Sequence, residues 1–505
     1  MNYELCIDDK VKEFVKKHLK DDVNKLALSK LPEGLDREFV IRQIHARQVL
    51  SKKLPSWAGN DELIFPKKLS LEQCSSELTA KYKTSLSAKL HEMTRKGFSA
   101  DSCNLADEHL VDEKLSTKPH ETSRKEFSAN SCNLVDEDLV DEEKSTNLHE
   151  ITRKEFSADS CNLVDEDLVD EKRILVDLTG GMGVDTAFLS DNFDKVYYVE
   201  MQEELCEIAK HNFKILNKNI EVVNDNAEHF LTICDKVDCI YLDPARRDEY
   251  GRKMVSLHDC SPDVVELHDI LLEKAKYVLI KVSPMLDIEM VKKELKDIAD
   301  IHVVAVRNEC KEVLIGIQEF RNSGVQEIET QSLKDTATLR LCDSATLIKI
   351  SATDLRENWN FAFTEDEELE AQWTLADNVG KYLYEPGVAC MKAGCFKLLS
   401  QKYNLDKLHR NSHLYTSDEL VSDFPGRIFE VVNVVPFDKK TKKNIWSLSL
   451  CDSATLKKAS VATRNFPLSA EELKKNLGLQ DGSEFYIFGT TMKGEKKVVV
   501  LTKKL

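Results

Sequence analysis

The spacing of apolar residues divides the chain into stretches with different predicted secondary structure. Over the first 88 residues, apolar side chains recur about every three to four positions, as in "DDKVKEFVKKHL" and "REFVIRQIHARQVLSKKL". The second of these helices is expected to end at "LPSW" (54–57), because a proline cannot continue a helix. We therefore predict a helical amino-terminal region over residues 1–88.

From residue 173 onward the pattern changes to short apolar runs that alternate with amphipathic stretches. This alternation is typical of a parallel α/β sheet, which we expect over residues 173–320. After residue 320 the pattern is mixed: "RIFEVVNVVPF" and "EFYIFGTT" predict strands, and "LSAEELKKNLGL" predicts a helix. The predicted fold class is α/β, with a Rossmann-like sheet between the helical region and small α+β domains.

A tandem repeat separates the first two regions. Units of the type "HEITRKEFSADSCNLVDEDLVDEK" begin at His91, His120 and His149, which gives a period of 29 residues. Apolar residues are sparse in these units and fit no helical or strand period, while charge is dense. We predict that residues 89–172 form a mobile acidic insertion; a small helical repeat or a partner-binding tail are the alternatives. A second repetition, "LCDSATL" at 341–347 and 450–456, has no physical explanation here.

Composition limits the class of protein and its compartment. Residues 91–172 contain 22 acidic and 10 basic residues, a net charge of −12 out of −18, so the other 423 residues carry only −6. The total charge therefore does not argue against binding to nucleic acid. The amino-terminal stretch does not resemble a secretory signal, and no apolar run approaches the ~18 residues of a membrane span. The 14 cysteines include no pair at a zinc-binding spacing. We expect a cytoplasmic protein with reduced cysteines and without membrane or metal partners.

The segment "RILVDLTGGMGVDTAFLS" (173–190) carries the strongest chemical signal. It predicts a buried strand, then a tight loop with Gly180, Gly181 and Gly183, and then the start of a helix. Glycines let the backbone adopt positive φ and approach a ligand closely, although a plain strand-to-helix turn would use them too. The next strand, "KVYYVE", ends in Glu200, twenty residues after Gly180, where a carboxylate is suited to ribose hydroxyls.

Two further predicted strands also end in polar residues. "IEVVNDNAEHFL" has Asp225 and Asn226 at its exit, and "DCIYLDPARR" ends in Asp243 and Pro244. Carboxyl ends of parallel strands meet at one edge of an open sheet, which is where such sheets bind ligands. The sequence therefore predicts a nucleotide-type binding site at this edge.

The pattern Asp-x-x-Gly-Gly-x-Gly resembles motif I of class I S-adenosylmethionine-dependent methyltransferases. The resemblance implies that the loop faces the amino-acid part of the cofactor and that Glu200 binds its ribose. It also implies that Asp225 or Asn226 contacts adenine, and which of the two does so is open. The cofactor-binding residues that we predict are Asp177, Thr179, Gly180, Gly181, Gly183, Asp185, Glu200, Asp225 and Asn226.

Asp243 and Pro244 correspond to motif IV of the enzymes that methylate exocyclic amines of bases. There the carboxylate, or a nearby carbonyl, accepts a hydrogen bond from the amine and orients its lone pair toward the methyl group, so proximity does much of the work. The resemblance makes Asp243 and Pro244 the predicted catalytic residues. Ala245 replaces the second proline of the motif and Arg246 replaces its aromatic residue, which leaves the acceptor atom open.

Longer segments resemble one bacterial family of class I methyltransferases with a ferredoxin-like and a THUMP-like domain. They include "RQIHARQVLSKKLPSWA", "LDPARRD", "IKVSPMLDI", "YLYEPGVACMKAGCFKLL" and "VATRNFPLSAEELKKNLGLQDG". The resemblance implies S-adenosylmethionine as cofactor, RNA as substrate, a ferredoxin-like region over 321–430 and a THUMP-like domain over 431–505.

Basic residues are the candidates for RNA contact. The predicted substrate-binding residues are Arg246, Arg247, Lys281 and Arg464. For the arginine loop after Asp243, a solvated loop or an internal Arg–Asp clamp is the alternative to phosphate contacts, and for Arg464 it is a structural ion pair. Further candidates at the cofactor mouth are Glu72, Gln73, Ser75 and Ser76, with a helix cap as the alternative.

The sequence leads to one main hypothesis and two alternatives. The main hypothesis is methyl transfer from S-adenosylmethionine to RNA, with an exocyclic guanine amine as the narrower expectation. The first alternative is a methyltransferase whose acceptor is a protein or a small molecule. The second is a cofactor-binding module that associates with RNA without catalysis.

Overall fold

The computed structural model describes residues 7–96, 172–246, 256–319, 347–445 and 458–505. Residues 91–96 of the first repeat belong to a helix that begins at Glu77, so the helical region continues past the predicted boundary at 88. Residues 97–171 of the repeats, Arg247 and the second "LCDSATL" segment lie outside these ranges, as does nearly all of the first. The predictions made for them therefore remain predictions.

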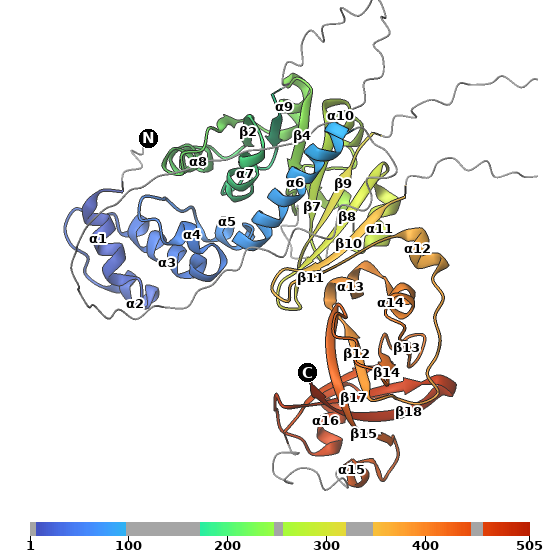
Figure 1. The fold of residues 1–505 in the computed structure, drawn as a ribbon. Coiled ribbons are helices and arrows are strands. Elements are labelled where there is room, and N and C mark those ends of the chain that lie inside the picture. Colours follow the sequence, from blue (N-terminus) through green and yellow to red (C-terminus); the bar gives the residue numbers. More distant parts are fainter. Residues whose placement is uncertain (1–6, 97–171, 247–255, 320–346, 446–457) are drawn as a thin grey trace, which may run out of the picture. The chain divides into compact units, whose positions relative to one another are not determined.

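The amino-terminal region is helical, as the apolar spacing predicts (Figure 1). Its first, second and third helices begin after Asp8, Asp22 and Asp36, whose carboxylates accept hydrogen bonds from backbone N–H groups of the first turn. The third helix ends before Leu54 as predicted, but Pro55 then begins another short helix, because the first helical position needs no N–H. The helices are α1 (Asp9–His18), α2 (Val23–Leu28), α3 (Arg37–Lys53), α4 (Pro55–Ala58), α5 (Lys68–Gln73) and α6 (Glu77–Lys96).

A nine-stranded sheet forms the centre of the fold, with strand order β11-β10-β8-β9-β7-β4-β1-β2-β3. The five strands from β7 to β3 run parallel, and β9 lies antiparallel between β7 and β8. This mostly parallel sheet confirms the predicted Rossmann-like α/β class. The strands are β1 (Ile174–Asp177), β2 (Lys195–Glu200), β3 (Glu221–Asn224), β4 (Val237–Leu242), β7 (Ala275–Val282), β8 (Ile298–Ala305), β9 (Cys310–Ile317), β10 (Lys349–Asp354) and β11 (Trp359–Thr364). A separate two-stranded ribbon pairs β5 (Ala245–Arg246) with β6 (Cys260–Ser261).

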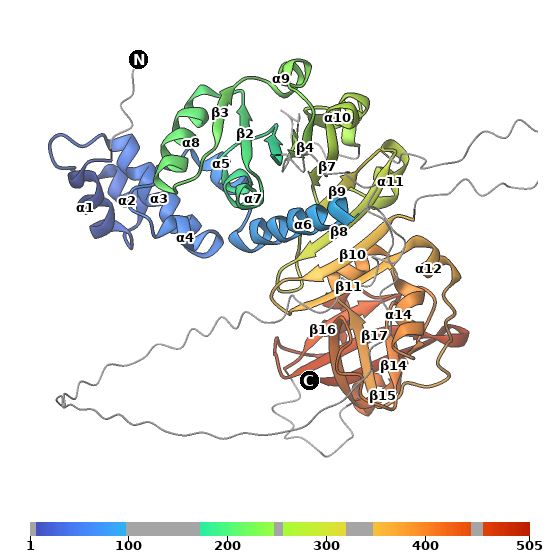
Figure 2. The ribbon, with the colours of Figure 1, turned by 45° about the horizontal axis from the view of Figure 1, so that its top comes forward.

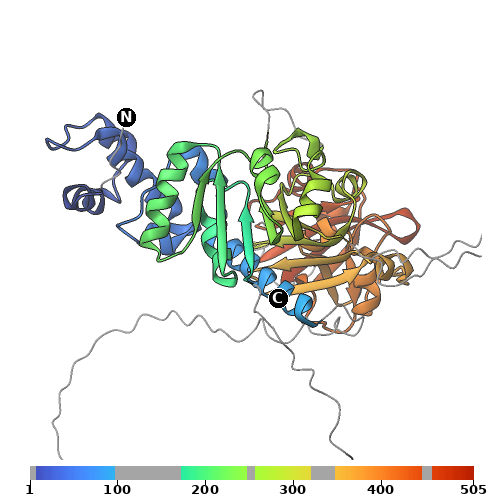
Figure 3. The ribbon, with the colours of Figure 1, turned by 90° about the horizontal axis from the view of Figure 1, so that it is seen from above.

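Helices cover both faces of this sheet (Figure 3). Successive side chains of a strand point to opposite faces, so Val199 packs in the cluster of α9 to α11 while Tyr198 packs in that of α7 and α8. Trp57 and Phe65 of the amino-terminal region join the second cluster. The helices are α7 (Val184–Leu189), α8 (Glu203–Ile215), α9 (Ala227–Ile233), α10 (His268–Lys274) and α11 (Ile288–Glu294), with 3₁₀ turns η2 (Ser190–Asn192) and η3 (Leu257–Asp259).

The carboxyl-terminal part contains a seven-stranded sheet of order β13-β14-β12-β15-β18-β17-β16. Neighbouring strands are antiparallel except β16 and β17, which are parallel. The strands are β12 (Tyr382–Pro386), β13 (Asp406–Lys407), β14 (Tyr415–Ser417), β15 (Gly426–Pro436), β16 (Ser460–Arg464), β17 (Phe485–Met492) and β18 (Lys496–Lys504). The helices are α12 (Glu365–Glu370), α13 (Val388–Ala393), α14 (Phe396–Lys402), α15 (Thr441–Asn444) and α16 (Ala470–Leu477), with the 3₁₀ turn η5 (Lys493–Glu495).

Candidate active site

The carboxyl ends of the parallel strands gather most of the residues that the sequence predicts for the site. Asp177 ends β1, Glu200 ends β2, Asp225 follows β3, Asp243 follows β4, and Lys281 is the penultimate residue of β7. These five strands are adjacent and parallel, so all five residues lie at one edge of the sheet. Their side chains are thus available to one ligand.

The glycine loop runs close against β2 and α8. A Cβ at Gly180 would lie 2.3 Å from the ring of Tyr198, and one at Gly183 would lie 2.8 Å from Phe213. Gly183 also has φ of 78°, where it precedes α7, a conformation that favours glycine. The Tyr198 hydroxyl donates to the Gly181 carbonyl at 2.6 Å and holds the loop in place.

Asp177 lies beneath this loop and is 1% exposed. Its carboxylate accepts from the Thr179 N–H at 3.0 Å and from the Thr186 hydroxyl at 2.5 Å. Burial raises the pKa of Asp177 to about 7, and the neighbouring charges of Asp185 and Asp243 act in the same direction. Asp177 therefore organises the loop from below, and part of it is protonated near neutral pH.

Glu200 connects the ends of β2 and β3 to the loop. Its carboxylate accepts from the backbone N–H of Gly181 and from that of Gln202, both at 2.9 Å, and its carbonyl accepts from the Asn224 amide at the same distance. A carboxylate oxygen has a further lone pair after one such bond, so Glu200 can still accept a hydroxyl group.

The residues after β3 are tied up in local contacts. The carboxylate of Asp225 lies 2.6 Å from Nδ1 of His229, and the contact lowers the pKa of Asp225. Asn226 caps α9 by accepting the His229 N–H at 2.7 Å. Which of the two residues would contact adenine stays open.

Asp243 joins the glycine loop to β7. Its backbone N–H donates to Thr179 Oγ1 at 2.6 Å, and its Oδ2 accepts from Lys281 Nζ at 2.5 Å. Burial alone would lower the pKa of Lys281, but the carboxylates of Asp243, Asp185 and Glu312 outweigh it and raise the pKa above its ordinary value. Lys281 is therefore a permanently charged partner of Asp243.

The carboxylate of Asp185 is held by other side chains of the protein. Its Oδ2 accepts from the hydroxyls of Ser75 and Tyr241, both at 2.8 Å, and its Oδ1 lies 3.2 Å from Lys83 Nζ. Burial opposes ionisation, but Lys83 and Lys281 lower the pKa of Asp185 overall. Its predicted role in holding the cofactor is untested, and the observed contacts are those of an internal anchor.

The predicted basic residues lie in different parts of the fold. Arg246 follows Asp243 by three residues and lies in β5, where it pairs with Cys260 of β6. Arg464 lies in the carboxyl-terminal sheet, where its Nη2 donates to Glu385 Oε1 at 2.6 Å, the ion pair that sequence reasoning gave as the alternative. Arg427 donates to the other oxygen of the same carboxylate.

Sequence reasoning missed Lys83, Glu312 and Tyr241 at this site. Lys83 is fully buried, and its ammonium donates to both carboxylate oxygens of Glu312, at 2.8 and 3.0 Å. Nothing in the sequence distinguishes Lys83 from a surface lysine of an amphipathic helix, and its partner is 229 residues away. Ser76, in contrast, caps α6 by accepting the Thr79 N–H at 3.2 Å, as the alternative for this segment predicts.

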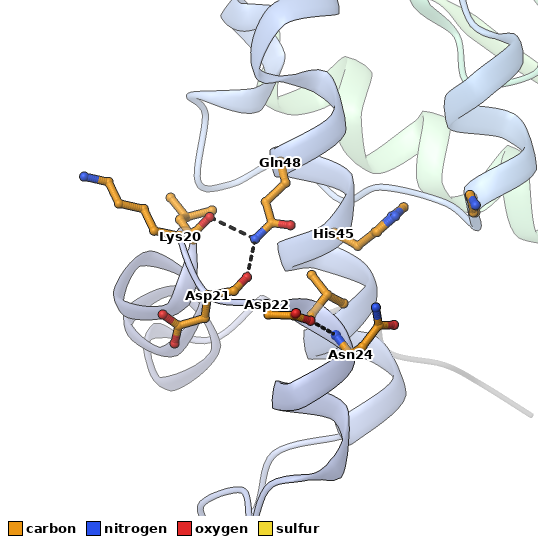
Figure 4. A pocket seen from close by; sticks show the side chains of 9 residues that line it. Lys20, Asp21, Asp22, Asn24, His45 and Gln48 are labelled. Carbon is orange, nitrogen blue, oxygen red and sulfur yellow. Dashed lines mark hydrogen bonds between the residues drawn. The ribbon is translucent and has the colours of Figure 1, made fainter.

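A hollow of about 700 Å³ lies elsewhere, among α1, α2 and α3 (Figure 4). The Gln48 amide in its wall donates to the carbonyls of Leu19 and Asp21, at 3.0 and 2.8 Å, and Asp22 caps α2. None of the residues predicted for the site lines it. Among the described residues, no group of three or more His, Cys, Asp or Glu could hold a metal ion. No helix in the described ranges is long and apolar enough to cross a membrane.

Comparison with known proteins identifies the carboxyl-terminal domains. Residues 382–425 match a family described as a ferredoxin-like domain, and residues 426–504 match one described as THUMP domain-like. Together with the Rossmann-like sheet, these matches define the class: an α/β protein with ferredoxin-like and THUMP-like carboxyl-terminal domains. The domain boundaries predicted from the sequence stay predictions; β10 and β11, which lie in the predicted 321–430 region, pair into the nine-stranded sheet.

A particular relative resembles the chain over its whole length. It is a "putative methyltransferase" from Porphyromonas gingivalis W83, with 27% sequence identity and a TM-score of 0.67, and the match covers 99% of this chain and 100% of the relative. The resemblance inferred from the motifs is thereby confirmed. No curated protein matches the chain.

Two further solved structures match the chain over about a third of its length. An rRNA methylase from Streptococcus thermophilus is 19% identical with a TM-score of 0.24, covering 30% of this chain and 89% of its own. A "putative methyltransferase" from Streptococcus mutans in complex with SAH is 18% identical with a TM-score of 0.22, covering 28% and 86%. Likenesses this weak carry no argument about the substrate.

Proposed function

We propose that the protein is an S-adenosylmethionine-dependent methyltransferase that acts on RNA. The observation that carries the proposal is the 2.6 Å hydrogen bond from the Asp243 N–H to Thr179 Oγ1, because it joins the predicted cofactor loop to the predicted acceptor end of β4. A methyl donor on the loop and an acceptor at Asp243 would then be neighbours, and such proximity supplies much of the rate in a group transfer. The whole-length likeness to a "putative methyltransferase" supports the same class of reaction.

The donor set at the sheet edge fits the cofactor. Glu200 retains acceptor capacity for ribose hydroxyls, and the polar groups of Asp225 and Asn226 suit an adenine edge. Gly181 and Gly183, both with positive φ, let the loop backbone approach the amino-acid end. When bound, S-adenosylmethionine supplies an electrophilic methyl group on a sulfonium cation.

The residues of the acceptor side then have separate tasks. Asp243 accepts a hydrogen bond from the acceptor amine and orients its lone pair, Pro244 stiffens the turn, and Lys281 fixes the carboxylate of Asp243 at 2.5 Å. We propose an exocyclic guanine amine as the acceptor.

The charge of the THUMP-like domain supports RNA as the substrate class. Residues 426–504 contain 15 basic and 8 acidic residues, a net charge of +7 in a chain whose total is −18. A basic domain in an acidic chain is the electrostatic pattern expected for contact with phosphates.

Isotope transfer tests the proposal directly. The purified protein is incubated with methyl-labelled S-adenosylmethionine and total RNA from a strain that lacks its gene. We expect label in RNA, and we expect Asp243→Asn to reduce incorporation by about a hundredfold while cofactor binding persists. Asp238→Asn is the matched control, because Asp238 lies on the same strand and pairs with Lys276 at 2.8 Å away from the site; it should retain full activity.

The same experiment separates the alternatives. Label in protein or metabolite fractions, with none in RNA, would show that the acceptor is a protein or a small molecule and not RNA. Calorimetric binding of the cofactor without turnover on any fraction would identify a binding module instead of an enzyme. Mass spectrometry of RNA from the deletion strain would identify the nucleotide that lacks its methyl group.

A further inference from the structure

Helix α6 runs alongside the nine-stranded sheet (Figure 2), and its Lys83 donates to Glu312 of β9. Ser75 just before the helix and Thr79, Lys83 and Ser87 within it recur every four residues, and each is at most 4% exposed. A helix that merely covers a core presents an apolar stripe. The polar stripe therefore calls for specific partners.

Lys83 has the most demanding of these contacts. Its ammonium group has three protons, and it meets Glu312 of β9, Asp185 of α7 at 3.2 Å and the Ser75 hydroxyl at 3.1 Å. The side chain is completely buried, and Glu312 is 2% exposed. Burying a charge is costly unless it is paired and hydrogen-bonded, and these contacts satisfy the lysine fully.

The pairing of Lys83 determines what is left for Lys281. Lys281 of β7 lies opposite Leu314 of the antiparallel strand β9, two residues from Glu312, so the side chains of Lys281 and Glu312 point to the same face of the sheet. The charges of Asp243, Asp185 and Glu312 all act on Lys281 and raise its pKa. Of these three carboxylates, Asp243 is the one hydrogen-bonded to Lys281 in the described part of the chain, at 2.5 Å. Glu312 instead accepts hydrogen bonds from Lys83, and Asp185 forms an ion pair with the same ammonium group at 3.2 Å.

We propose that Lys83 is a positioning residue that directs Lys281 onto Asp243. With Lys83 in place, Glu312 and Asp185 share its positive charge and Lys281 extends to Asp243. Without it, two buried carboxylates would lack a cationic partner, and Lys281 would turn toward them because unpaired buried charges are the more costly. Helix α6 would then be a working part of the acceptor site, and the role in methylation rests on the proposed function above.

A double-mutant cycle tests, without any assay of methylation, whether Lys83 makes Lys281 select Asp243 as its partner over Glu312 and Asp185. Asp243→Asn removes the partner of Lys281, and the shift in the urea midpoint is measured in the parent protein and in Lys83→Met. We expect the shift in the Lys83→Met background to be less than half of that in the parent, because Lys281 has already left Asp243. Equal shifts in the two backgrounds would overturn the proposal.

Two controls separate selection from direct attraction between Lys83 and Asp243. In a Lys281→Met background the difference between the two shifts should vanish, whereas direct attraction would leave it unchanged and overturn the proposal. Lys81→Met is the matched control on the same helix, because Lys81 is exposed and pairs with Glu77 at 2.9 Å. The Asp243→Asn shift should be the same in that variant as in the parent.

A second variant keeps the test valid if Lys83→Met does not fold. Lys83→Met with Glu312→Gln leaves two carboxylates for one lysine, which restores the surplus of one negative charge found in the parent. The shift in the urea midpoint caused by Asp243→Asn is then compared between this double variant and Glu312→Gln alone. We again expect a smaller shift in the protein that lacks Lys83. Equal shifts would again overturn the proposal.

The catalytic consequence is measured separately. If the protein methylates RNA, Lys83→Met should lower kcat by about tenfold or more with the KM for the cofactor unchanged, because Asp243 loses its orientation. A normal kcat in a less stable protein would reduce Lys83 to a structural role. If no RNA is methylated at all, the proposed function fails, while the urea cycle still decides whether Lys83 directs Lys281.

Discussion

Strands β4 and β7 form an Asp–Lys pair at each of their two ends, and the two pairs differ in their surroundings. At the amino ends Asp238 and Lys276 lie 2.8 Å apart, with side chains 28% and 58% exposed. At the carboxyl ends Asp243 and Lys281 lie 2.5 Å apart, and Lys281 is only 13% exposed. In sequence both pairs have the same types of residue, five positions apart on each strand.

The two pairs contain the same residue types, so the surrounding side chains must make the carboxyl-end pair suited to binding and catalysis. Asp238 pairs with Lys276 at the surface and also accepts the Ile174 N–H. The Asp243–Lys281 pair has a second, buried group of charges beside it, in which Lys83 pairs with Asp185 and Glu312. Three carboxylates thus share two lysines. A surplus of one negative charge in a partly dry site would favour a bound cation such as the sulfonium of the proposed cofactor.

The largest difference between the two pairs is expected when the lysine is removed. Lys281→Met leaves Asp243 without its cation beside two other carboxylates and should lower the free energy of unfolding by about 2 to 4 kcal/mol. Lys276→Met breaks a solvated pair and should cost less than about 1 kcal/mol. Urea unfolding of both variants measures this contrast. Equal losses would show that the inner carboxylates do not act on the carboxyl-end pair.

The carboxyl edge should also differ from the amino ends of the strands in how stability depends on pH, because it contains Asp177. Its pKa in the folded protein, about 7, lies above the ordinary value of 3.8, chiefly through burial. The stability contributed by its neutral form is therefore fully present below pH 3.8 and is lost as the pH rises through 7.

Asparagine does not titrate, so the free energy of unfolding of Asp177→Asn should lack this loss. Relative to the parent, the variant should become more stable by about 2 kcal/mol as the pH rises from 5 to 8. Urea unfolding at both pH values measures the trend, whatever the constant cost of the substitution. A difference between the two proteins that does not vary with pH would mean that Asp177 is ionised throughout this range.

Elements with a strong local pattern were predictable from the sequence. "KVYYVE" is strand β2 with the predicted bounds, and Val184 begins the helix after the glycine loop. Both follow from local rules, the apolar run of a buried strand and the turn that glycines allow. The gathering of Asp177, Glu200 and Asp243 at one edge followed from the parallel topology, which the alternation of strands and helices indicates.

Contacts between distant parts of the chain were not predictable in this way. Lys83 and Glu312 look like solvent-facing residues, because their burial depends on the pairing of α6 with β9. Similarly, the strand alternation of residues 349–364 does not reveal that β10 joins β8 and extends the first sheet. Such features depend on tertiary packing, on which a single sequence carries little information.

The smallest predicted effect tests whether the same balance of charges operates in the carboxyl-terminal sheet. There the proportion is reversed: one carboxylate, Glu385, is 4% exposed and accepts from both Arg464 and Arg427. Two arginines on one carboxylate leave a surplus positive charge, and the side chain of Arg464 is 39% exposed. We expect this surplus to face the phosphates of a bound RNA.

Arg464→Ala removes the surplus without leaving Glu385 unpaired, because Arg427 still binds it. Stability should therefore change by less than about 1 kcal/mol, while the slope of log Kd for RNA against log salt concentration falls by about 1. Filter binding between low and moderate salt measures the slope. Lys474→Ala is the matched control, since Lys474 pairs one-to-one with Asp481 at 2.6 Å and has no surplus to lose. If both variants lower the slope equally, net charge alone governs binding, and the arrangement around Glu385 has no special part in it.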